Sequence, residues 1–131
     1  NKDIQRYNTL GAAHKHLKNY TEGERAFQTA ISLARSYQER EWIGIASWYL
    51  GNLYIEQSHF QKAIDTLEST LAYAIKSDDN KHNRTYANHL LGLARAYIGL
   101  GNYPKADVAL KKIHYQHAMN DKKYYSFGKN H

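Results

Sequence analysis

The chain has 131 residues, a length typical of one domain, and its hydrophobic content of 42% supports a packed core. It contains no cysteine, which excludes disulfides and thiolate metal sites and is compatible with a reducing cytoplasm. No segment approaches the roughly 20 apolar residues needed to span a bilayer. The net charge is +6, and residues 87–131 contribute most of it through seven basic and two acidic side chains. We therefore expect a cytoplasmic protein without membrane partners.

One helical face occurs three times along the chain. Its copies begin at Gly11, Gly51 and Ala94, at spacings of 40 and 43 residues. Each copy is followed by a turn and by a second apolar stripe with helical spacing, which ends on Phe27, Leu67 and Leu110. A small residue at the same place in each copy indicates close packing against the second helix, because a large side chain there would push the two helices apart. The pattern predicts a stack of helix pairs, which is typical of binding proteins.

The periodicity predicts helices near 2–18, 21–37, 40–57, 60–76, 82–100 and 103–118, and a seventh beginning near Asp121. Capping boxes are expected at Thr21–Glu24 and at Ser58–Gln61, and Pro104 fits the first turn of a helix. No glycine-, serine- or proline-rich linker interrupts the pattern. Residues 1–131 are therefore expected to form a single domain with repeats at about 4–43, 44–86 and 87–120. The tail resembles the opening of another repeat, which indicates a fragment of a longer protein.

The segment from Leu93 to Ala106 resembles the tetratricopeptide repeat (TPR) family, with a small residue, then Tyr97 on the first helix, then Asn-Tyr and a small residue at the second helix. The resemblance extends over about residues 4–118. It implies an all-α fold, a right-handed superhelical α-solenoid of antiparallel helix pairs with three TPR-like repeats plus the start of a further helix. The copies depart from the family pattern at His14, Gly23 and Thr70, and their spacing exceeds the usual ~34 residues.

In a stack of helix pairs the first helices line the concave wall, so the function is expected there. Asparagine side chains pair with both groups of a peptide bond, aromatic side chains offer apolar area, and arginine holds carboxylates. Two alternatives remain open, since the aromatic side chains also suit packing between repeats and Arg95 also suits an ion pair with Glu56. The predicted peptide- or protein-binding residues are Asn8, Trp48, Tyr49, Asn52, Asn88 and Arg95.

Two narrower resemblances bear on the partner. Chaperone-binding TPR proteins carry a carboxylate clamp, but this chain has Asn8, Ala12, Tyr49, Asn88 and Gly92 at the matching places, so no chaperone carboxylate-clamp ligand is expected. The long repeat spacing and the asparagine-rich groove resemble bacterial peptide-pheromone receptors of the Rap, PlcR and NprR type. That resemblance implies the peptide-sensing part of a bacterial transcriptional or signalling regulator.

Catalysis and metal binding find no support in the motifs. The chain has no phosphate-binding glycine loop and no nucleophile elbow, so we expect neither an enzyme nor a cofactor. His114 and His117 are three residues apart but lack a third ligand, so no metal site is expected.

An alternative function is a scaffold segment that assembles a complex and contacts nucleic acid through its basic end. Lysines alternate there with aromatic residues, a combination that binds phosphates and stacks on bases. The lysines are Lys111, Lys112, Lys122, Lys123 and Lys129, and the aromatic residues are Tyr115, Tyr124, Tyr125 and Phe127. Homo-oligomerisation is left open.

Overall fold

The computed structural model describes residues 1–74 and 80–114, and the side chains of residues 80–83 are left aside. The described residues form only helices and turns, so the predicted all-α class is confirmed. The labelled helices are α1 (Lys2–His16), α2 (Tyr20–Ser36), α3 (Arg40–Glu56), α4 (Phe60–Ala74) and α5 (Asn80–Gly99), and a further helix covers 103–114. They match the predicted helices to within a few residues. The predicted seventh helix near Asp121 lies outside the described residues.

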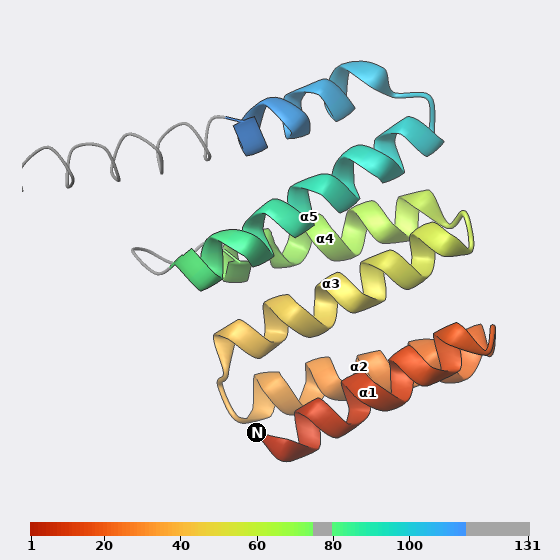
Figure 1. Ribbon diagram of the computed structural model, residues 1–131, viewed down its shortest axis with the longest axis vertical. Helices are drawn as coiled ribbons and strands as arrows, with labels where there is room; N and C mark the ends of the chain where they lie inside the picture. Colours follow the sequence, from red (N-terminus) through yellow and green to blue (C-terminus); the bar gives the residue numbers. More distant parts are fainter. Residues whose placement is uncertain (75–79, 115–131) are drawn as a thin grey trace, which may run out of the picture.

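The helices stack as antiparallel hairpins (Figure 1). The first helices α1, α3 and α5 form one layer, in which α1 contacts α3 and α3 contacts α5. The second helices α2 and α4 lie behind this layer, and within the described part of the chain they do not approach each other. Each second helix instead packs on the first helix of its own repeat and on that of the next repeat. This arrangement is the α-solenoid expected from the repeats.

The small residues on the first helices lie where the paired helices cross. A Cβ atom added at Gly11 would lie 2.5 Å from a ring carbon of Phe27, and one added at Gly51 would lie 2.7 Å from Leu67 Cδ2. Phe27 and Leu67 are themselves fully buried. The expected packing role of both glycines is therefore confirmed, because a methyl group at either position would displace a core side chain.

The turns between helices are built differently from the prediction. Lys18, Gln38 and Ser58 have left-handed backbones, with φ of 64°, 56° and 61°. The amide that follows such a residue returns to the preceding helix, as in the 2.8 Å bond from His59 N to Tyr54 O. Both predicted capping boxes are wrong, because neither Thr21 nor Ser58 is the residue just before its helix. Helix α2 begins at Tyr20 and α4 begins at Phe60. Thr21 consequently lies inside α2 and Ser58 forms the turn before α4.

A tyrosine, a glutamate and a lysine meet at each boundary between repeats. The hydroxyl of Tyr54 donates a 2.7 Å hydrogen bond to Glu24 on α2, and that of Tyr97 donates to Glu68 on α4. A lysine lies over each ring, with Lys105 Nζ 5.7 Å from the centre of the Tyr97 ring. Burial and the nearby carboxylate raise the pKa of Tyr97 to about 12. Burial and Glu24 likewise raise the pKa of Tyr54.

The boundary between α4 and α5 also contains a buried histidine. His89 is completely buried, with Nδ1 3.0 Å from the Thr85 carbonyl and Nε2 3.1 Å from Thr70 Oγ1. Because a carbonyl only accepts, Nδ1 carries the hydrogen in the neutral ring. The single hydroxyl hydrogen of Thr70 is then shared between Nε2 and the Thr66 carbonyl, which lies 2.8 Å from Thr70 Oγ1. Burial lowers the pKa of His89, and the hydrogen bond to Thr85 opposes this only in part. Thr70 therefore departs from the family's alanine because it pairs with this imidazole.

Candidate peptide-binding groove

A pocket of about 370 Å³ opens between the first helices α1 and α3. It lies on the layer where the sequence predicts the binding wall. Its lining combines two aromatic side chains with two side-chain amides and one hydroxyl, a mixture suited to an extended peptide. The lining residues are Gln5, Asn8, Thr9, Ala12, Trp42 and Tyr49.

Asn8 is the buried polar member of this pocket. The residue is 6% exposed, and neither Oδ1 nor Nδ2 has a hydrogen-bond partner among the residues that the structure describes. A buried amide without a partner costs about 1–3 kcal/mol, so folding alone does not favour asparagine here. Residues of this kind are expected where a ligand supplies the missing hydrogen bonds.

The aromatic side chains of α3 serve both packing and the pocket. The Tyr49 ring stacks on the buried Phe27 ring at 5.5 Å and 9°, and Trp48 lies beside it at 5.1 Å and 45°. Tyr49 also lines the pocket, whereas Trp48 does not. Tyr49 is therefore held rigidly by the core, and a rigid aromatic side chain binds a ligand at a low cost in conformational entropy.

The pocket brings together only part of the predicted set. Asn8 and Tyr49 line it, whereas Trp48, Asn52, Asn88 and Arg95 do not. Asn52 and Asn88 are half-buried on α3 and α5, and the exposed Arg95 forms no ion pair with Glu56. The roles of the four residues outside the pocket thus remain predictions.

Three polar or aromatic lining residues were missed in the sequence. Trp42 precedes Tyr49 by seven residues, two helical turns, and this spacing places both rings on one face of α3. Gln5 and Thr9 lie on α1, four residues or about one helical turn apart. The i, i+7 spacing of the two aromatic residues was the signal that could have found Trp42.

Other classes of site were searched in the part of the chain that the structure describes. That part holds no group of three or more potential metal ligands. No helix in it is both long and apolar enough to cross a membrane. Of the two histidines considered as ligands, His114 is exposed and His117 lies outside the described residues.

Stacked antiparallel helix hairpins with a groove on the first-helix layer define a helical-repeat protein of the solenoid class. A family model described as tetratricopeptide repeat matches residues 4–76, and another with the same description matches residues 90–118. The chain belongs to the tetratricopeptide repeat family. Repeats of this family generally mediate protein–protein interactions and are typically not enzymes. A comparison with curated proteins found no match.

Proposed function

We propose that the groove between α1 and α3 binds an extended peptide segment of a protein partner. The observation that carries this proposal is the unpaired amide of Asn8 in a pocket with Trp42 and Tyr49. An asparagine amide donates to the carbonyl and accepts from the N–H of one peptide bond. The two aromatic side chains would receive an apolar side chain of the peptide.

Access to the amide requires a small local movement. Both polar atoms of Asn8 are shielded from solvent, although the neighbouring Gln5 and Thr9 are exposed. Changes of rotamer in exposed side chains are fast, and such a change at the pocket would open the amide to a ligand. Binding would then gain the two hydrogen bonds that the folded chain lacks.

A narrower form of the proposal makes the chain the peptide-sensing part of a bacterial regulator acting in the cytoplasm. The repeat spacing of 40 and 43 residues supports it through the resemblance to the peptide-pheromone receptors. A peptide that contacts both α1 and α3 would favour one angle between two neighbouring repeats, which would shift the population of solenoid shapes. The alternative scaffold with nucleic-acid contact depends mainly on residues 115–131, which lie outside the described part.

The test is selection of binders from a random peptide library on the purified chain, followed by titration of a selected synthetic peptide. We expect Asn8→Leu and Trp42→Ala to weaken binding by about tenfold or more, because each removes contacts worth at least ~1.4 kcal/mol. Arg25→Ala, at an exposed position on α2 and outside the pocket, serves as the control and should leave affinity unchanged. A selected peptide that binds both pocket variants as tightly as the unmodified chain would refute the assignment.

A further inference from the structure

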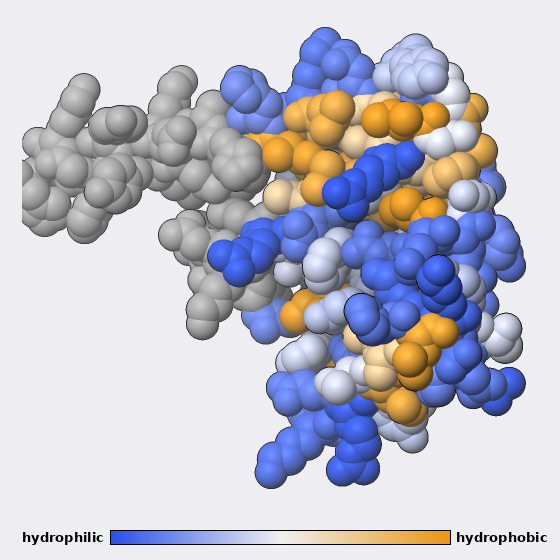
Figure 2. Space-filling model, turned by 45° about the vertical axis from the view of Figure 1, so that its right-hand side comes forward, coloured by the Kyte–Doolittle hydropathy of each residue, from blue (hydrophilic) through white to orange (hydrophobic). Residues whose placement is uncertain are grey.

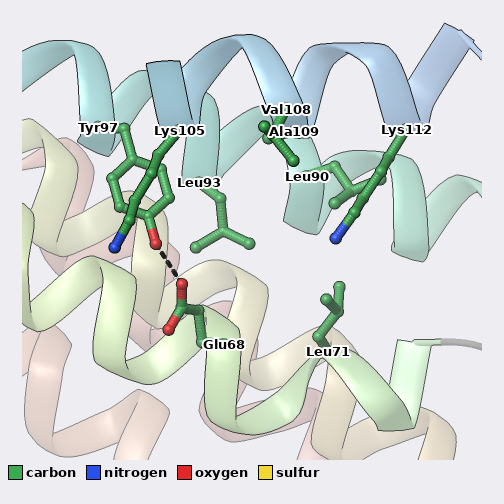
Figure 3. Close-up of a pocket in the computed structure, with 9 residues that line it drawn as sticks. All are labelled: Glu68, Leu71, Leu90, Leu93, Tyr97, Lys105, Val108, Ala109 and Lys112. Carbon is green, nitrogen blue, oxygen red and sulfur yellow. Dashed lines mark hydrogen bonds between the residues drawn. The ribbon is translucent and has the colours of Figure 1, made fainter. Parts of the chain in front are cut away.

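A second hollow, of about 420 Å³, lies between the second helix α4 and the helix 103–114 (Figure 3). We call it the outer trough. Its floor is α5, which contributes Leu90, Leu93 and Tyr97, and its walls are α4 and the helix 103–114. Because its walls are second helices, it lies on the second-helix side of the stack, whereas the peptide-binding groove lies between two first helices. The remaining lining residues are Glu68, Leu71, Lys105, Val108, Ala109 and Lys112.

The apolar wall of the outer trough is not a requirement of the repeat. The preceding repeat carries polar residues 43 positions earlier, where Asp65, Thr66 and Ser69 correspond to Val108, Ala109 and Lys112. Both second helices pack on their first helices despite this difference, so the fold tolerates polar residues at these places. Val108 is nevertheless 52% exposed. A single exposed apolar side chain is ordinary, but several that gather on one surface indicate contact with another molecule.

Hydrophobic surface gathers at this end of the molecule. Figure 2 shows apolar patches at the height of α5 and the following helix, crossed by strongly hydrophilic side chains. Exposed apolar residues there include Ile98, Leu100, Tyr103, Val108 and Leu110.

The charges around the outer trough select the occupant. Lys105 and Lys112 extend into it from one face of the helix 103–114, and the Glu68 carboxylate accepts the hydrogen bond from Tyr97 (Figure 3). The neighbouring Lys111 is paired with Asp107 at 2.9 Å, whereas Lys112 has no ion pair with any described residue. The outer trough thus offers two ammonium groups about 10 Å apart along the helix.

We propose that the outer trough docks an acidic amphipathic helix of a partner protein. Its apolar face would fill the space between Leu71 and Val108, and two carboxylates seven residues apart would meet Lys105 and Lys112. A second copy of the chain is a poor occupant because its net charge is +6. The segment 115–131 is also poor, since it carries three lysines and one aspartate.

The probe is a labelled synthetic helix of about two heptads with leucines on one face and two glutamates seven residues apart. Its counterpart replaces both glutamates by lysine. Fluorescence anisotropy with the full chain should show the acidic helix binding about tenfold more tightly than the basic one, with the difference shrinking as salt is added. Equal binding of the two peptides would overturn the proposal.

Variants that introduce residues of the preceding repeat locate the binding. Val108→Asp places a carboxylate in the outer trough and should weaken binding of the acidic helix about tenfold, while Lys112→Ser should weaken it about two- to fivefold. Lys111→Ser is the matched control and should not change it. Circular dichroism checks that each variant is folded. Unchanged binding by folded Val108→Asp would overturn the proposal. It would also be overturned if the unmodified chain self-associates and Val108→Asp makes it monomeric, because the outer trough would then bind a second copy of the chain.

Discussion

Replacing Asn8 by leucine gives the sharpest test of the groove, because stability and binding should change in opposite directions. Asn8→Leu removes a buried amide whose oxygen and nitrogen both lack partners within residues 1–74 and 80–114. Leucine is of similar size, is apolar and is a better helix former, so the pocket wall is retained.

The expected gain follows from the burial of this side chain. At 6% exposure the unpaired amide costs about 1–3 kcal/mol, and the change of residue removes that cost. The entropy of unfolding for 131 residues, at about 2.1 cal/mol/K per residue, converts this gain into a rise of about 4–10 °C in Tm.

The assay is thermal unfolding followed by circular dichroism, together with titration of a selected peptide. Thr9→Ala is the control, since Thr9 is an exposed neighbour in the same pocket and its loss should change the free energy of unfolding by less than about 0.5 kcal/mol. A lower Tm for Asn8→Leu would refute the reasoning on stability. A higher Tm with unchanged peptide affinity would support that reasoning and refute the proposed function.

Three further predictions concern the repeat scaffold. Gly11→Ala should destabilise the chain by about 1–2 kcal/mol in a urea titration, because the added Cβ would lie 2.5 Å from the buried Phe27 ring. Gly44→Ala should instead stabilise the chain by up to ~1 kcal/mol, because the nearest atom to its Cβ is 3.5 Å away. The reverse order would contradict the packing role. Ser58→Gly should raise Tm by a few degrees, because Ser58 has a φ of 61°; a fall would contradict it. Because burial lowers the pKa of His89 in the folded chain, the unfolded chain takes up this proton at a higher pH than the folded chain does. The free energy of unfolding should therefore keep its full value above about pH 6.5 and fall by up to ~1.4 kcal/mol per pH unit below it. His89→Gln should flatten that fall, and an unchanged slope would rule His89 out as its source.

The sequence predicted the helices well because their signal is repeated. The apolar stripe and the glycines that face it recur at matching positions, with Gly11 opposite Phe27 and Gly51 opposite Leu67. Each copy therefore strengthens the helix prediction for the others. The turns were predicted less well. Left-handed residues are usually glycine, and of the four left-handed turn residues in the described part of the chain only Gly101 follows that rule.

The candidate site was only partly predictable. Asn8 could be placed on the first-helix layer from its position in the repeat, but its unpaired amide depends on the side chains that surround it in three dimensions. The pocket joins residues of two repeats, so the relative rotation of α1 and α3 decides which of them meet. The sequence alone does not determine that rotation, and in the structure Trp42 rather than Trp48 lines the pocket.

The buried imidazole between α4 and α5 has a consequence for the order in which the chain comes apart. In a linear stack each repeat touches only its neighbours, so a weakened boundary releases the repeats beyond it without unfolding the rest. Because burial disfavours the charged ring, we expect protonation of His89 to weaken the α4–α5 boundary. In mildly acidic solution the third repeat should therefore separate first, and amide hydrogens of α5 should exchange with solvent before those of α3. The outer trough, which needs both α4 and α5, would be lost in that step, whereas the groove between α1 and α3 would persist.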